Sequence, residues 1–197
     1  MAEIKNCIEL ADIDAAISCA DLDNLAGLVQ ELIYGYWEDV ATFPDMPSAT
    51  ADSALSLEVA GAWDGDLTMK AGCRAYRAVF TEDSGEFSIT DQGEKGGESF
   101  LYALTVVRAR MSKVLFGFEN ATKGRRLFLI VKDKNGNNYL MGDALNACHK
   151  VAGEGSTTGK AASELNRSAL KFEYSCPRKL IYVGDVSKIL TIASPGV

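Results

Sequence analysis

Apolar and polar residues alternate with a period of two in many short segments of the chain. In residues 28–40, LVQELIYGYWEDV, aromatic and aliphatic side chains alternate with polar ones, and Gly35 is a candidate bulge or point of close backbone approach. Turn residues separate this segment from further strand candidates. They are residues 55–60, 66–71, 73–83, 85–92, 99–111, 169–176 and 179–186. The arrangement predicts a meander, sandwich or barrel of antiparallel strands.

Residues 112–122, SKVLFGFENAT, break this alternation. Val114, Leu115 and Phe118 fall on one side at helical spacing, and Gly124 suits a C-terminal stop. The pattern predicts one short helix flanking a mainly β domain of the α+β class.

The clearest hairpin follows this helix. An apolar run from Leu127 to Val131 leads to the pair Asn135 and Gly136, which is typical of a tight type I′ turn. Residues 138–141 then form the returning strand.

Residues 143–166 contain the glycine-rich stretch GEGSTTGK. A phosphate-binding loop needs two glycines separated by four residues, and a Ser or Thr after the lysine. Here the glycine spacing differs and Ala161 follows the lysine, so we expect no ATP or GTP binding. We predict instead a long loop that orders mainly against another subunit. Its candidate inter-subunit residues are Gly153, Gly155, Gly159 and Lys160.

The chain has 197 residues, of which 47% are hydrophobic, so it can bury the core of a single domain over residues 1–197. Residues 1–27 are a candidate N-terminal arm, whose spacing suits either a loose helix or an extended lead-in. They lack a long apolar run, so we expect no signal peptide or membrane span. The five cysteines are scattered without a CxxC pair, which favours reduced thiols over disulfides or a zinc site.

Charge is distributed unevenly along the chain. Residues 1–66 carry 14 acidic residues and one basic residue, for −13, whereas residues 67–197 carry 13 acidic and 19 basic residues, for +6. The net charge of −7 disfavours a general nucleic-acid binder. The division is compatible with ordinary solvated faces, and equally with two complementary surfaces that suit head-to-tail association.

Three groups of residues invite chemical interpretation. His149 and Cys148 are adjacent, so on a strand they point to opposite faces, which favours a solvated histidine beside a packed cysteine over a catalytic pair. The carboxylates of Asp12, Asp14, Asp21 and Asp23 lack the spacing of a calcium loop and indicate a solvated acidic face. The basic stretch 123–128 suits either nucleic acid or an acidic partner subunit. We therefore expect no enzyme, metal or cofactor.

The order of these elements resembles the tail tube (major tail) proteins of long-tailed bacteriophages. The resemblance covers most of residues 19–190, and its most specific piece is LFLIVKDKNGNNYLMG, residues 127–142. The N-terminal CADLDNLAGLVQELIYGYWEDV also resembles the opening of virion proteins from phages of anaerobic gut bacteria.

The resemblance implies a β-sandwich with one flanking helix. It further implies hexameric rings of this chain that stack into a hollow tube, contacts with other tail proteins, and passage of DNA without specific binding. The protein would assemble in the host bacterial cytoplasm and reside in the virion tail. The alternatives are a tail terminator or adaptor, and a ligand-binding β-domain or enzyme without an identifiable site.

Overall fold

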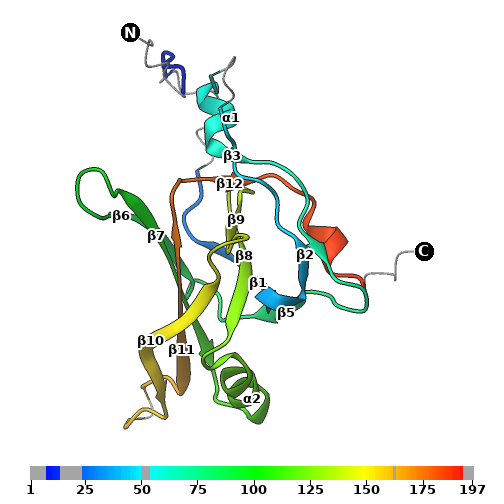
Figure 1. The fold of residues 1–197 in the computed structure, drawn as a ribbon. Coiled ribbons are helices and arrows are strands. Elements are labelled where there is room, and N and C mark those ends of the chain that lie inside the picture. The colour runs from blue at the N-terminus through cyan, green and yellow to red at the C-terminus, as the bar shows by residue number, and fades with distance from the viewer. Residues whose placement is uncertain (1–7, 14–23, 50–53, 162, 193–197) are drawn as a thin grey trace.

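A computed structural model of the chain describes residues 8–13, 24–49, 54–161 and 163–192. Ten strands form one curled sheet, in which eight follow the order β3-β12-β9-β8-β10-β11-β7-β6 and β1 links β8 to β5 (Figure 1). The strands of this sheet are β1 (Leu28–Tyr36), β3 (Ala62–Trp63), β5 (Tyr76–Val79), β6 (Glu86–Gln92), β7 (Ser99–Ala109), β8 (Arg126–Asp133), β9 (Asn138–Met141), β10 (Cys148–Thr157), β11 (Arg167–Cys176) and β12 (Ile181–Tyr182). Strands β2 (Val40–Thr42) and β4 (Thr68–Met69) form a separate pair.

The long strand pairs are antiparallel, and the short β12–β3 pair is parallel. The sheet curls into a half-barrel whose open side is narrowed by the connection between β5 and β6. In that connection the Thr81 amide and the Ser84 hydroxyl both donate to the carbonyl of Val107 on β7, each at 2.9 Å. The fold is therefore mainly β with a short flanking helix, as the sequence pattern predicts.

Strand β8 lies at the centre of the fold and separates two hydrophobic cores. Leu127, Leu129 and Val131 pack into the core inside the half-barrel, whereas Phe128 and Ile130 pack into a second core on the opposite face. None of the five is more than 2% exposed. Because both faces of β8 are covered, the strand is continuously apolar instead of alternating.

Gly35 on β1 is a point of close approach, as predicted. It lies opposite Phe128 of β8, and a Cβ atom at position 35 would come within 2.5 Å of the Phe128 ring. The ring is fully buried and covers the glycine, so only a residue without a side chain fits there.

The predicted helix is α2 (Lys113–Thr122), which begins where the Ser112 hydroxyl accepts a hydrogen bond from the Leu115 amide at 3.2 Å. A positive φ of 65° at Gly124 follows its end, as the sequence indicates. Leu115 is buried on the half-barrel, but Val114 is 83% exposed, so the apolar stripe of α2 extends past the surface that it covers.

The prediction of a strand at residues 55–60 is wrong. This segment contains helix α1 (Leu57–Gly61), whose first turn is capped by the Ser56 hydroxyl accepting from the Val59 amide at 3.3 Å. The serine cap and Glu58 in the first turn favour a helix over the short alternation. Two 3₁₀ helices, η2 (Trp37–Asp39) and η3 (Val186–Ile189), complete the elements.

The β8–β9 hairpin forms at the predicted place, but its turn is not type I′. Asp133 pairs with Asn137, and the Gly136 amide donates to the Asp133 carbonyl at 3.2 Å, which leaves a three-residue loop. Of Asn135 and Gly136, only Gly136 has a positive φ, at 97°. The Asp133 side chain, which accepts from the Asn137 amide at 2.8 Å, favours this longer loop with a glycine bulge.

Of the candidate N-terminal arm, residues 8–13 and 24–27 are described, and the rest lies outside the described residues. Ile8 bridges Leu55 in parallel, and the Glu9 amide donates to the Leu55 carbonyl at 2.8 Å. No helix in the described ranges has both the length and the hydropathy needed to cross a membrane.

Candidate functional site

The predicted loop at residues 143–166 is mostly strand, which corrects the sequence interpretation. Residues 148–157 form β10, which pairs with β11 from His149↔Glu173 to Thr157↔Arg167. Only 143–147 and the tip, residues 158–166, connect strands. The glycine content concealed the strand because its side chains are small and its outer half has no apolar alternation.

The four candidate residues lie along this β10–β11 ribbon and have local structural roles. Gly155 has a φ of 72° at the point where pairing with β11 resumes after a bulge between Val151 and Gly155. Gly159 has a φ of 73° in the tip, and the backbone amide of Lys160 donates to the Glu164 carboxylate at 2.6 Å. Gly153 packs its backbone against β11, where an added Cβ would lie 3.3 Å from Cβ of Lys171. The stretch runs as strand and turn, without the helix that follows a phosphate loop.

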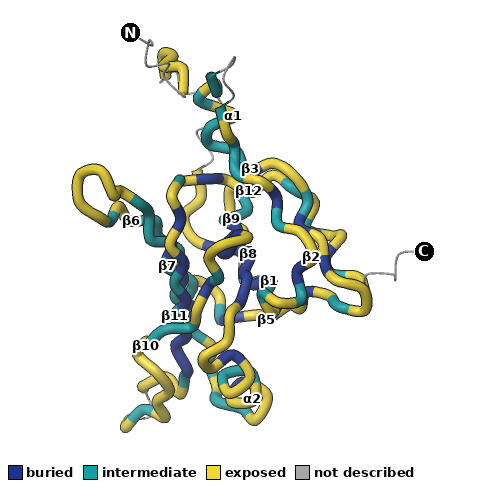
Figure 2. Tube along the Cα trace, in the orientation of Figure 1, coloured by how far each residue is buried: buried dark blue, intermediate teal, exposed yellow. Residues whose placement is uncertain are grey.

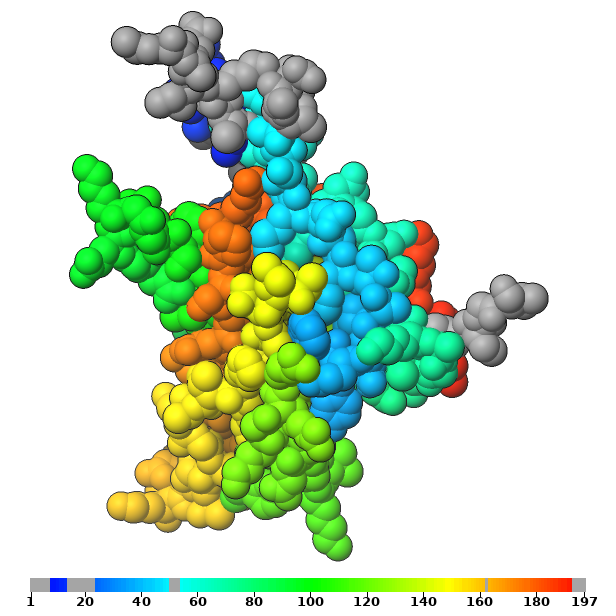
Figure 3. All heavy atoms as spheres, in the orientation of Figure 1, coloured from blue at the N-terminus to red at the C-terminus, as the bar shows by residue number. Residues whose placement is uncertain are grey.

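The outer half of β10 is an exposed strand edge. Beyond His149, β10 pairs with β11 on one side, and no described strand pairs with its other side. Residues 152–158 are all exposed, in contrast to the barrel strands (Figure 2). In the space-filling view the ribbon tip and the β6–β7 hairpin both project from the body (Figure 3). An uncovered edge of this length is a site for pairing with another chain.

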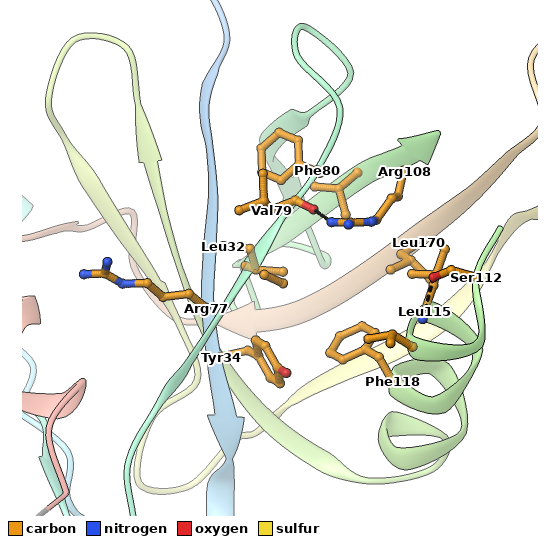
Figure 4. Close-up of a pocket in the computed structure, with 13 residues that line it drawn as sticks. Leu32, Tyr34, Arg77, Val79, Phe80, Arg108, Ser112, Leu115, Phe118 and Leu170 are labelled. Atoms are coloured by element: carbon orange, nitrogen blue, oxygen red, sulfur yellow. Dashed lines mark hydrogen bonds between the residues drawn. The ribbon is translucent and has the colours of Figure 1, made fainter. Parts of the chain in front are cut away.

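A second surface feature is an apolar groove between α2 and the β1–β5 strand pair. One half encloses about 290 Å³, and its walls carry aliphatic and aromatic side chains (Figure 4). Leu32 of β1 and Phe118 of α2 point toward each other across it. Its other half encloses about 380 Å³ and continues along α2 past Tyr36 and Tyr76. We name the two halves together the α2 groove.

Tyr34 stands where the two halves of the α2 groove meet. Its ring makes an edge contact with Phe118 at 4.9 Å between centroids and approaches Tyr76 at 6.0 Å. Burial, with a smaller contribution from Tyr76, raises the pKa of the Tyr34 phenol, which therefore stays neutral. The groove wall at this point is a neutral aromatic surface.

The mouth of the α2 groove is basic. Arg108 lies there, and one of its guanidinium nitrogens donates to the backbone carbonyl of Val79, whereas the Arg77 side chain points away from the groove. Arg77 pairs with Glu31 at 3.1 Å, but no carboxylate in the described part of the chain forms a salt bridge with Arg108, Arg110 or Lys113. This end of the molecule therefore carries uncompensated positive charge next to exposed apolar surface.

A polar cluster fastens α2 to the ribbon. The Glu119 carboxylate accepts from the Lys150 ammonium at 3.2 Å and from the Ser168 hydroxyl at 2.6 Å. Ser168 is fully buried, and both charged side chains are about four-fifths buried, at 20% and 21% exposure. The helix is thus held against β10 and β11 by charge-assisted hydrogen bonds.

A buried network that the sequence did not reveal surrounds Asp143. Its carboxylate accepts from the amides of Leu145 and Asn146 at 2.6 and 2.7 Å, and from the Tyr174 hydroxyl at 2.5 Å. Its carbonyl accepts from the Trp37 indole at 2.7 Å. Burial, more than any neighbour, raises the pKa of Tyr174. Every partner is satisfied, so this is a structural anchor that fixes the turn after β9.

The other residues considered from the sequence do not converge. Cys148 is fully buried and His149 is exposed, which confirms their opposite orientations, and burial raises the pKa of the Cys148 thiol. Arg126, in the basic stretch, pairs with Glu38 at 2.8 Å and lies over the Trp37 ring at 4.2 Å. Asp14, Asp21 and Asp23 lie outside the described residues, within which no group of potential metal ligands gathers.

The chain was compared with protein-family models, curated proteins and solved structures, and none of the three comparisons gave a match.

Proposed function

We propose that this chain is a structural protein that assembles with copies of itself into rings, which stack into a tube of the phage tail tube type. The observation that carries the proposal is the exposed outer edge of β10 at the end of a ribbon that projects from the barrel. Self-assembly covers such an edge, and a two-stranded ribbon is only marginally stable without a partner surface.

The composition of the ribbon supports a backbone contact. Ala152, Gly153, Gly155 and Ser156 carry small side chains, so the main chain of a neighbouring copy can approach closely. Glu154 is held by Arg167 at 2.7 Å across the ribbon, which pre-orders the exposed half. A ribbon ordered in advance loses less conformational entropy when it associates.

Charge gives the association a direction. Residues 1–66 carry −13 and residues 67–197 carry +6, so oppositely charged surfaces of two copies attract when they meet, beyond the pairs that Glu31, Glu38 and Asp66 form within one copy. Head-to-tail contacts of this kind are heterologous, and they produce closed rings or open filaments according to the rotation between copies.

The proposal is tested by placing a lysine on the β10 edge. Ala152→Lys puts a long charged side chain on the exposed strand, whereas Ala144→Lys makes the same change at an exposed position outside the ribbon. We expect Ala152→Lys to remain monomeric in sedimentation velocity under conditions where the wild type and Ala144→Lys form large species. Equal assembly by all three proteins would remove the ribbon from the interface.

A further inference from the structure

We propose that residues 9–13 of one copy add as a strand to the free edge of β5 in the next copy and fill the α2 groove. The inference rests on the proposed self-assembly, since it requires a second copy placed end to end with the first. It identifies which two parts of the chain meet.

The edge of β5 that borders the groove has no strand partner among the described residues. Strand β5 pairs with β1 alone among the described strands. The Phe80 amide donates to the Gln30 carbonyl at 3.1 Å, and pairing alternates along an antiparallel ladder, so the backbone groups of Arg77 and Val79 face away from β1. The Arg108 guanidinium donates a hydrogen bond to the carbonyl of Val79 from the side away from β1, as expected if this carbonyl faces outward.

The surfaces on either side of this edge are apolar. Val114 of α2 is 83% exposed and Val79 of β5 is 52% exposed, and Tyr76 is 45% exposed beside them. Val114 and Tyr76 line the α2 groove. The Val79 side chain lies on the opposite face of β5, because Val79 is two residues from Arg77, and only its backbone borders the groove. Large apolar side chains exposed on the rim of a groove favour contact with a partner.

Residues 8–13, IELADI, have the matching chemistry. Leu10 is 89% exposed and Ile13 is 86% exposed, although both are large aliphatic residues. Glu9 and Asp12 give the segment two negative charges and no positive one. The segment thus combines apolar anchors with carboxylates, while the groove combines apolar walls with Arg108, which forms no salt bridge with a described carboxylate.

The alternation of an added strand fits both faces of β5. In an extended segment Leu10 and Asp12 share one face, whereas Glu9 and Ile13 lie on the other. Leu10 then enters the α2 groove, and Asp12 on the same face points toward Arg108 at the mouth of the groove. Glu9 lies on the same face as the Arg77 side chain, which Figure 4 shows pointing away from the groove. Main-chain pairing with side-chain pockets on one face is how peptides add to sheet edges.

The occupant comes from a second copy because the two parts lie at opposite ends of one molecule. Residues 8–13 lie beside α1, where Glu9 is held by Leu55, and α2 lies at the far end (Figure 1). Copies placed end to end bring one acidic segment to one basic groove. The contact is heterologous and repeats along the assembly.

A labelled peptide with the sequence of residues 8–13 tests the contact without requiring assembly. The receptor is the full chain carrying Leu10→Asp, so that its own segment does not compete. We expect saturable binding in fluorescence anisotropy. Val114→Asp in the receptor should weaken peptide binding at least tenfold. A peptide with aspartate in place of its leucine should also bind at least tenfold more weakly. An acidic residue in the first turn of α2 favours the helix, so this receptor variant keeps its fold.

The matched control is Leu145→Asp, since Leu145 is 90% exposed and lies outside the α2 groove. It should leave peptide binding unchanged. Absence of saturable binding, or equal binding by the Val114→Asp and Leu145→Asp receptors, overturns the inference. If tubes form while the peptide does not bind, the inference fails alone and the proposed function stands. If the peptide binds but the chain never forms rings or tubes, the groove contact stands and the proposed tube function fails.

Discussion

Substitution of Gly35 by alanine should destabilise the fold through a single overlap. The new Cβ would meet Cε1 of Phe128 at 2.5 Å and Cζ at 2.9 Å, where carbon atoms in contact ordinarily lie about 3.5 to 4.0 Å apart. The ring cannot withdraw, because Phe128 is fully buried in the second core. The backbone of Gly142 packs closely on it as well, since a Cβ built on Gly142 would lie 3.3 Å from the Phe128 Cβ.

Overpacking of this kind costs about 1 to 3 kcal/mol. The lower backbone entropy of alanine in the unfolded chain offsets roughly 0.5 to 1 kcal/mol of it. The difference is a net loss of about 0 to 2.5 kcal/mol, and the 2.5 Å overlap with a ring that cannot move places Gly35→Ala at about 1 to 2 kcal/mol within it, which lowers the melting temperature by about 2 to 8 °C for a chain of this size.

The measurement is thermal unfolding of dilute monomer followed by circular dichroism. Gly117→Ala is the matched control, because a Cβ at Gly117 on α2 meets nothing within 4 Å. Alanine there should raise stability by up to about 1 kcal/mol through helix propensity. A Gly35→Ala protein that melts at or above the wild-type temperature would refute the reasoning. Phe128→Leu should reduce the effect of Gly35→Ala in a double-mutant cycle, since the ring causes the clash.

Further predictions concern the buried network, pH, thiol reactivity and salt. Tyr174→Phe removes the hydroxyl that donates to Asp143 at 2.5 Å, and urea unfolding should show a loss of about 1 to 3 kcal/mol. The hydrogen bond from Lys188 lowers the pKa of Asp66, so the stability that this carboxylate contributes is present above its unfolded pKa and is lost as pH falls through the lower folded pKa. Thermal scans from about pH 5 to about pH 3 should therefore show a smaller decline for Asp66→Asn than for the wild type. Cys148 is fully buried with a raised pKa, and mass spectrometry after iodoacetamide treatment should find it unmodified until the protein unfolds; rapid labelling in the native state would contradict its placement. Assembly should weaken as salt rises from about 0.1 M to about 1 M, where the screening length falls from about 10 to about 3 Å, and light scattering that grows with salt would point to apolar association instead.

The sequence predicted those elements whose own residues decide them. The apolar run of β8, the glycine stop after α2 and the restriction at Gly35 are local signals, and each corresponds to a feature of the structure. Strand β10 was missed because a strand held by its neighbour β11 needs no apolar pattern of its own. Helix α1 was missed because five residues are too few for a helical period to appear.

The α2 groove was beyond prediction for a different reason. Its walls come from β1, β5 and α2, which are far apart in the sequence, and strand pairing alone brings Tyr34 next to Tyr76. The helical spacing placed Val114 with Leu115 and Phe118 on one apolar side, but the spacing cannot tell which of the three the half-barrel covers. Only the docking of α2 leaves Val114 exposed.

Electron microscopy of the purified wild-type chain at high concentration tests the central proposal most directly. Self-assembly through the β10 edge predicts rings of uniform diameter that stack into hollow tubes, and the Ala152→Lys protein under the same conditions should show neither. A wild-type chain that stays monomeric at every concentration and at low salt, with no rings or tubes in the images, would contradict it.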